Sequence, residues 1–225
     1  MILYVNGDSH SEGHDAVVKG PNLEHSYGKL LADQLKYTFI CDAVSGCSND
    51  SIINRTLDFL NHNNTDFVII GWSTWERETW YWDKKPYNFT SSGTDLVHPM
   101  LQDLYKEWVS QSVTEVNLRQ KEKENHIKIY LFHKLLENKK IPHLFFNCYS
   151  HFFFNQKYNE PKYNWGKYRQ NYLDPYNQNM TYYFWLQQQG FKPSNPKYFH
   201  YGADAHRAWA EFLLPKVHTV LTHNG

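Results

Sequence analysis

The stretch Gly7-Asp8-Ser9 is the first place in the chain where the residue types could do chemistry. It directly follows the apolar run of residues 2–5, Ile-Leu-Tyr-Val, with almost nothing between. A serine at a strand-to-loop turn exposes its hydroxyl and points its own N–H into the same cleft, as an acyl-transfer nucleophile with an oxyanion donor requires. The alternative is that Ser9 caps a following helix or stabilises the turn.

A second group of candidate residues follows position 71, where Trp and Tyr become frequent. Exposed aromatic faces stack on sugar rings or cover acyl chains, and charged side chains beside them add polar contacts. The possible substrate-binding residues are therefore Trp72, Trp75, Glu76 and Arg77. The alternative is that these rings pack the segment against the body of the domain.

The alternation of apolar patterns predicts the elements that position these residues. Strands are expected at residues 2–6, 37–44, 66–71 and 142–148. Helices are expected at 24–35, 51–60, 113–139, 181–189 and 202–221, with another starting near Leu101 and the last interrupted at Pro215. In the helix over 113–139 the expected buried positions are Val116, Leu118, Ile127, Tyr130, Leu131 and Leu135. Strands that alternate with helices predict a parallel sheet covered on both faces.

We predict one domain over residues 1–225, with insertions at about 73–100 and 150–196, because no repeat or flexible linker divides the chain. Sites in such folds lie at the carboxyl ends of the strands. Ser9, Gly46 and Ser73 each follow a predicted strand, so we expect them at one edge of the sheet.

Composition and charge exclude several classes of protein. With 41% hydrophobic residues the chain has a sizeable core, and equal numbers of basic and acidic residues, 23 each, give no field that attracts nucleic acid. The phosphate-loop, dinucleotide and structural-zinc motifs are missing, so we expect no cofactor and no metal. The sequence leaves the oligomeric state open.

No apolar run approaches the roughly 20 residues that span a bilayer, and the N-terminus lacks the basic start of a signal peptide. Three cysteines at no metal-like spacing suit a reducing compartment. We therefore expect no membrane insertion and a cytoplasmic or virion-associated protein.

Two stretches carry a resemblance to a known family. Gly-Asp-Ser-His-Ser at residues 7–11 resembles the first block of the SGNH (GDSL-like) hydrolase superfamily, whose nucleophile is the serine of that block. Ala-Val-Ser-Gly-Cys-Ser-Asn-Asp at 43–50 resembles the second block, in which a glycine supplies an oxyanion-hole N–H. The resemblance implies that Ser9 is the nucleophile and that Gly46 is an oxyanion donor, on a three-layer α/β/α sandwich with a parallel flavodoxin-like sheet.

The third block departs from the family pattern. Ser73, in Gly-Trp-Ser-Thr, stands where the family has an oxyanion-hole Asn. A hydroxyl donates one hydrogen bond but reaches less far than an amide side chain. Ser73 is thus a third candidate oxyanion donor.

The stretch from Tyr198 to Glu211 resembles the last block, and this resemblance implies that His200 is the general base. The family usually has an Asp three residues before this histidine, but this chain has Lys197. Asp204 is the nearest candidate acid partner, with the alternative that it only favours a helix N-terminus. A second alignment makes His206 the base instead.

The resemblance implies a serine esterase that needs no cofactor, and the aromatic and amide-rich insertions favour small acyl groups on carbohydrate as substrates. The alternative is a catalytically decayed module of the same fold that binds a glycan or a partner. A third interpretation is a structural or assembly protein, since the unusual blocks and the Asn/Lys/Tyr-rich composition are similar to SGNH-like proteins of tailed phages.

Overall fold

The computed structural model describes residues 1–91, 97–112, 114–153 and 170–223. Its centre is a parallel sheet with the strand order β2-β1-β3-β6. The strands are β1 (Ile2–Gly7), β2 (Thr38–Cys41), β3 (Phe67–Trp72) and β6 (His143–Asn147). A single parallel bridge from Phe145 to Tyr172 extends the sheet beyond β6. All four predicted strands are confirmed.

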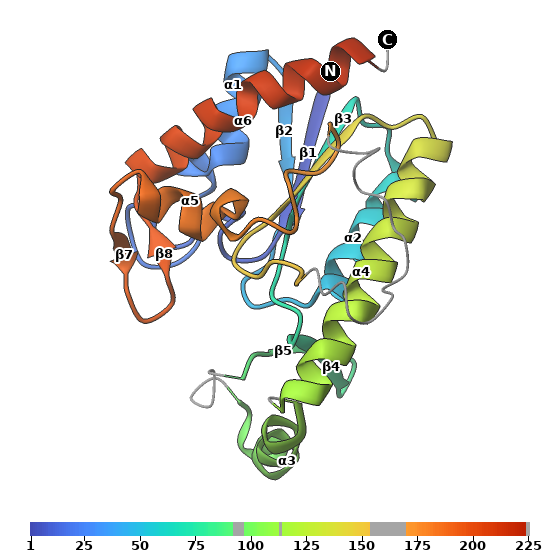
Figure 1. Cartoon of the computed structure of the whole chain (residues 1–225), viewed down its shortest axis with the longest axis vertical. Helices are drawn as coiled ribbons and strands as arrows, with labels where there is room; N and C mark the ends of the chain where they lie inside the picture. Colours follow the sequence, from blue (N-terminus) through green and yellow to red (C-terminus); the bar gives the residue numbers. More distant parts are fainter. Residues whose placement is uncertain (92–96, 113, 154–169, 224–225) are drawn as a thin grey trace.

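Helices cover both faces of this sheet, which gives three layers (Figure 1). One face carries α1 (Tyr27–Leu35), α5 (Tyr182–Gln188) and α6 (Ala203–His223), and the other carries α2 (Asn49–His62) and α4 (Glu115–Asn138). Successive residues of each strand point to opposite faces. Leu3 and Val5 therefore pack under α1 and α6, while Tyr4 packs under α2. The three-layer α/β/α fold with a flavodoxin-like parallel sheet is confirmed.

Local sequence explains where two of these helices lie. Ser48 caps α2 by accepting a hydrogen bond from the N–H of Ser51, as its place before the helix predicts. In α1, a Cβ at Gly28 would lie 2.9 Å from the Phe39 ring and 3.0 Å from the Val5 side chain. The missing side chain lets this helix pack directly on the sheet.

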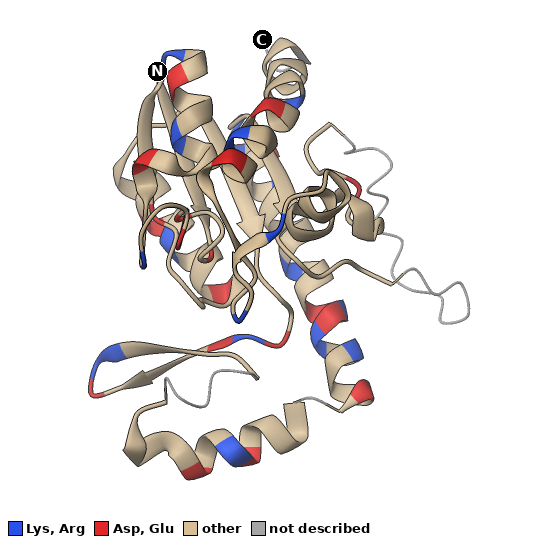
Figure 2. Cartoon of the chain, turned by 90° about the vertical axis from the view of Figure 1, so that its left-hand side faces the viewer, with Lys and Arg blue, Asp and Glu red and all other residues tan. Residues whose placement is uncertain are grey.

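The predicted insertion at 73–100 contains a hairpin that the sequence analysis missed. Strands β4 (Glu78–Trp82) and β5 (Lys85–Phe89) are antiparallel, and the turn residues Asp83 and Lys84 both have positive φ, as in a type I′ turn. With α3 (Gln102–Ser112) the hairpin forms a small lobe at one end of the molecule (Figure 2). Residues 92–96, and 154–169 of the second predicted insertion, lie outside the described residues.

Two helix predictions need correction. We expected Pro215 to interrupt the last helix, but α6 continues through it. Leu213, Val217 and Val220 are fully buried, and their packing outweighs the roughly 3 kcal/mol that an internal proline costs. In α4 the prediction was wrong for Val116 and Leu131, which are 77% and 60% exposed, and Leu118 is also exposed.

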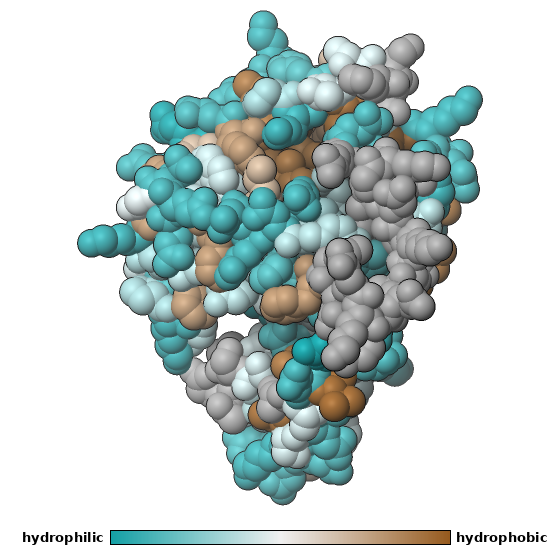
Figure 3. Space-filling model, viewed as in Figure 1, coloured by the Kyte–Doolittle hydropathy of each residue, from teal (hydrophilic) through white to brown (hydrophobic). Residues whose placement is uncertain are grey.

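The surface seen in Figure 3 is mainly hydrophilic among the described residues, with hydrophobic residues in small separate areas. None of the helices within the described ranges is long and apolar enough to cross a bilayer.

Candidate active site

The loop that contains Ser9 begins where β1 ends, at the centre of the sheet. Gly7 pairs with Gly71 of β3, and a Cβ on Gly7 would lie only 2.7 Å from the Gly71 carbonyl oxygen. A glycine is needed there so that the chain can turn against its neighbour. The chain crosses from β2 to β3 on the two sides of β1, so Ser9 lies at the topological switch point where sites form in such folds.

The loop after β2, which contains Gly46, is fixed to the end of β1. The N–H of Val44 donates to the Gly7 carbonyl at 3.1 Å, and the Cys47 thiol donates to the same oxygen at 3.2 Å. Gly46 has a φ of +73°, a conformation that favours glycine. Within the described residues, the N–H groups of Ser9 and Gly46 donate to no other protein group. Both are therefore available to a ligand.

The structure brings His200 to the Ser9 loop from the other end of the chain. His200 begins the short strand β8 (His200–Tyr201), which pairs with β7 (Pro193–Asn195). The N–H of Ala203 donates to the Ala16 carbonyl at 3.0 Å. The N–H of His14 donates to the Ser9 carbonyl at 3.0 Å, and the His14 ring centre lies 4.9 Å from that of His200.

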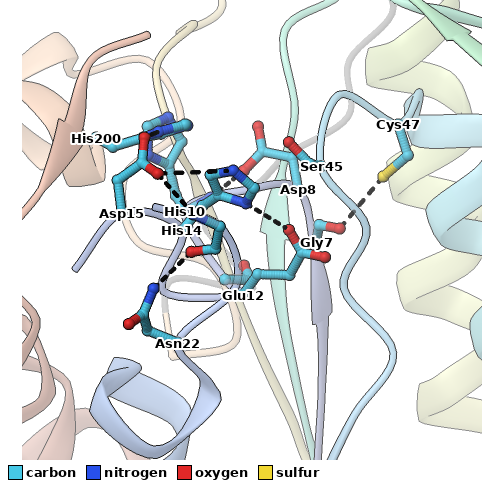
Figure 4. A network of polar contacts seen from close by, with 12 residues as sticks. Gly7, Asp8, His10, Glu12, His14, Asp15, Asn22, Ser45, Cys47 and His200 are labelled. Carbon is cyan, nitrogen blue, oxygen red and sulfur yellow. Dashed lines mark hydrogen bonds and ion pairs between the residues drawn. The ribbon is translucent and has the colours of Figure 1, made fainter. Parts of the chain in front are cut away.

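Nδ1 of His200 lies 2.8 Å from Oδ2 of Asp15 (Figure 4). Asn195 donates to the same oxygen at 2.8 Å, and the N–H of Gly20 donates to Oδ1. Burial raises the pKa of Asp15, but the hydrogen bonds from His200, Gly20 and Asn195 outweigh it and lower this pKa to about 2. Asp15 is thus a carboxylate that holds the imidazole with its proton on Nδ1 and the lone pair on Nε2.

Asp15 is the residue that the sequence analysis missed. We named Asp204 as the possible acid partner, but Asp204 is exposed in the first turn of α6 and the carboxylate at His200 is that of Asp15. The sequence carries one indirect signal, an acid six residues after Ser9 in the same loop.

His200 is buried, at 5% exposure, and Ser9 is buried at 4%. Burial lowers the pKa of His200, and its hydrogen bond with Asp15 raises it by a smaller amount. The ring is therefore neutral at neutral pH and able to accept a proton. His206, the alternative base, contacts the Tyr182 hydroxyl through its ring nitrogens, and burial lowers its pKa to about 3.

His10, the neighbour of Ser9, has a polar atom without a partner. Its Nδ1 is buried and makes no hydrogen bond within the described part of the chain. The His10 ring lies edge-on to His200, with 5.7 Å between the ring centres. A buried nitrogen without a hydrogen bond costs free energy, so we expect a water molecule or a polar substrate atom to bind to it.

Ser73 is close to this loop, but its donors are already used. Its hydroxyl donates to Oδ2 of Asp8 at 3.2 Å, and its N–H donates to Oδ1 of Asn49 at 2.8 Å. We expected Ser73 to donate to an oxyanion. Since the hydroxyl has one proton and donates it to Asp8, Ser73 has no hydroxyl proton left for an oxyanion.

The Asp8 carboxylate binds both Arg77 and the backbone of the Ser9 turn. Its Oδ2 forms an ion pair with Nη1 of Arg77 at 2.8 Å, and its Oδ1 accepts the N–H of His10 at 3.0 Å. Burial raises the pKa of Asp8, but electrostatic interactions with His10 and Arg77 and the hydrogen bond from the N–H of His10 outweigh it and lower this pKa. The buried carboxylate stays ionised and fixes the turn on either side of Ser9.

The residues expected to bind substrate lie in different places. Trp72 is fully buried in the core under α4, and Trp75 stacks on the ring of Phe152 at 4.5 Å. Trp72 is a core residue, which corrects its expected binding role, whereas Trp75 and Glu76 also line a cavity with Phe153 and Phe184. Glu76 accepts a hydrogen bond from the Thr74 hydroxyl. Arg77 faces Asp8.

Comparison with known proteins shows the fold. No protein-family model matches the chain, and no curated protein matches it. The solved structure of TesA has a TM-score of 0.51 and 13% identity, with 98% of this chain and 99% of that chain covered. A putative lipolytic protein of the G-D-S-L family from Desulfitobacterium hafniense has a TM-score of 0.50 and 12% identity, with 96% and 99% covered.

A third similar structure is a carbohydrate esterase family 2 enzyme with a carbohydrate-binding domain, from Corynascus thermopiles (Myceliophthora fergusii). Its TM-score is 0.50 at 13% identity, with 98% of this chain and 66% of that chain covered. Identities this low establish the fold alone. The chain has the α/β/α fold of the SGNH hydrolases, as the sequence blocks predicted.

Proposed function

We propose that this chain is a serine esterase in which Ser9 is the nucleophile, His200 the general base and Asp15 the acid that orients the base. The observation that carries the proposal is the hydrogen bond between His200 Nδ1 and Asp15 Oδ2. A carboxylate at Nδ1 fixes the tautomer whose Nε2 accepts a proton and stabilises the imidazolium that forms. It takes the place of the missing acid at position 197.

The reaction then follows two steps. His200 Nε2 takes the Ser9 proton while Oγ attacks the ester carbonyl, and the oxyanion accepts hydrogen bonds from the N–H groups of Ser9 and Gly46. The imidazolium returns the proton to the leaving alcohol. In the second step His200 activates a water molecule, which releases the acid and restores the Ser9 hydroxyl.

Small acyl esters of carbohydrates are the proposed substrates. The similar carbohydrate esterase structure supports this choice. The full burial of Trp72 removes the support that we had expected from stacking on its ring, whereas Trp75 lines a cavity. The substrate class is therefore best tested directly, with acetylated mono- and oligosaccharides beside p-nitrophenyl acetate.

A fluorophosphonate probe tests the nucleophile itself. We expect wild-type protein to be labelled on Ser9 and the Ser9→Ala variant to stay unlabelled and to lose esterase activity. Ser45→Ala is the matched control, because Ser45 is an exposed serine in the neighbouring loop. If the wild type is not labelled and Ser9→Ala keeps the parent's rate, the esterase proposal is wrong and a binding module of the same fold is favoured.

A further inference from the structure

His14, Asp15 and His200 place two imidazole nitrogens and a carboxylate around one point. The three ligand atoms that they offer lie within 4.8 Å of one another. Nε2 of His14 is 3.8 Å from Oδ1 of Asp15, and Nδ1 of His200 is 2.8 Å from Oδ2. Ligand atoms around a tetrahedral zinc ion, bound at about 2.0–2.2 Å, lie roughly 3.4 Å apart. Small side-chain shifts would bring all three atoms to that spacing.

The surroundings of His14 are those of a metal ligand. Its Nδ1 lies 3.3 Å from Oε2 of Glu12, so the ring lies between two carboxylates and points one nitrogen at each (Figure 4). With Glu12 accepting a hydrogen bond from Nδ1–H, the proton stays on Nδ1 and the lone pair of Nε2 faces Asp15. A carboxylate behind a histidine in this way orients many metal-binding imidazoles and raises their basicity. This contact is independent of the His200–Asp15 pair.

We propose that Nε2 of His14, the carboxylate of Asp15 and Nδ1 of His200 bind a divalent transition-metal ion such as zinc, and that the bound ion switches off the esterase. Two imidazoles and one carboxylate suit Zn²⁺, Co²⁺, Ni²⁺ or Cu²⁺ and do not suit Mg²⁺ or Ca²⁺. The His14 side chain is 23% exposed, which gives the ion access from solvent.

The inhibition follows from where the ring proton of His200 must go, and this part rests on the proposed function. A neutral imidazole has one ring proton and one lone pair. When Nδ1 gives its lone pair to the metal, the proton that Asp15 held there moves to Nε2. Nε2 then has no lone pair for the Ser9 proton, so the base is lost although the side chains shift only slightly.

Cobalt binding tests the site without using activity. Tag-free protein freed of metal is titrated with Co²⁺, and the visible d–d absorption of tetrahedral Co²⁺ is followed, with Zn²⁺ added as competitor. We expect one site in the wild type and in Ser9→Ala, and binding weaker by at least about tenfold in His14→Gln. The matched control is His62→Gln, because His62 and Asp58 form an exposed histidine–carboxylate pair in α2. The site is overturned if His14→Gln binds Co²⁺ like the wild type or if the wild type gives no such spectrum.

The inhibition is measured as the ratio of esterase rates with and without Zn²⁺ for each variant. We expect the ratio to be far below one for wild type and His62→Gln, and close to one for His14→Gln. Mg²⁺ should leave every ratio at one. A wild type that keeps its rate with the site filled overturns the switch, whereas an inactive wild type that still binds Co²⁺ through His14 contradicts the esterase proposal alone.

Discussion

His200 and Asp15 form a hydrogen bond of 2.8 Å between residues that are 185 positions apart in the chain. The bond makes the loop after β1 carry both the proposed nucleophile and the acid partner of the base. This differs from the arrangement that the resemblance to SGNH hydrolases implies, in which the acid lies three residues before the histidine. The first prediction concerns this bond.

Asp15→Asn should lower kcat by about 10³–10⁴-fold, because an amide no longer holds the proton on Nδ1 or stabilises the imidazolium. KM should change little. The measurement is initial rates on p-nitrophenyl acetate. Asp204→Asn is the matched control and should keep the parent's kcat, since Asp204 is exposed. The opposite pattern, with loss of rate only in Asp204→Asn, would return the acid role to Asp204.

Gly46→Ala should lower kcat by roughly 10²–10³-fold, the usual cost of displacing an oxyanion donor. The residue has a φ of +73°, so a side chain forces the backbone N–H to move. Gly190→Ala is the matched control: its φ is +85° and its added Cβ meets nothing within 4 Å. Both variants should lose about 1–2 kcal/mol of stability from backbone strain, but only Gly46→Ala should lose rate. Equal rates in the two would exclude Gly46 as a donor.

Ser73→Ala should affect stability more than rate. The hydroxyl donates to the buried carboxylate of Asp8 and accepts from Arg77, so its removal should cost about 1–3 kcal/mol in the free energy of unfolding, measured with urea. Ser110→Ala, at an exposed serine, should change that free energy by less than about 0.5 kcal/mol. A hundredfold fall in kcat at unchanged stability would restore the oxyanion role for Ser73.

The folded chain should lose stability in mild acid through His143. Burial lowers the pKa of this histidine to about 4, against smaller raising effects of the Ile141 carbonyl and Glu137. The pKa of a histidine in the unfolded chain is about 6.5. Between about pH 6.5 and about pH 4 the unfolded chain therefore binds more protons than the folded one, and the free energy of unfolding falls as the pH falls. The full loss is about 3 kcal/mol, reached below about pH 4.

Urea midpoints measured from about pH 7 down to about pH 4.5 test this pH dependence. Nδ1 of His133 lies 2.7 Å from Nε2 of His143. Burial and the neighbouring histidine lower the pKa of His133 to about 3, so His133 also contributes to the loss of stability in acid. His143→Gln should reduce the slope of the urea midpoint plotted against pH. His62→Gln should leave it as it is, and a slope that does not respond to His143→Gln would contradict the assignment.

The sheet and its covering helices were predictable because long apolar runs and caps are local signals. Ser48 before α2 and the unbroken apolar run of β3 each identify an element without reference to the rest of the chain. The continuity of α6 through Pro215 was not predictable in this way. It depends on tertiary packing that outweighs a local preference.

The candidate site was predictable only where a motif carried it. Ser9, Gly46 and His200 follow from sequence blocks, and their loops meet through backbone hydrogen bonds. Asp15 belongs to no such block, because its role is set by a contact across nearly the whole chain. The burial of Trp72 is equally non-local, since it depends on the packing of α4.

The pairing of an early carboxylate with a late imidazole also has a consequence for biosynthesis. While the ribosome is still adding the last strand and helix, the nascent chain already contains Ser9 but not yet His200, the proposed base. In the proposed mechanism, hydrolysis therefore requires that translation has passed His200 and that β8 has docked on the loop around Asp15.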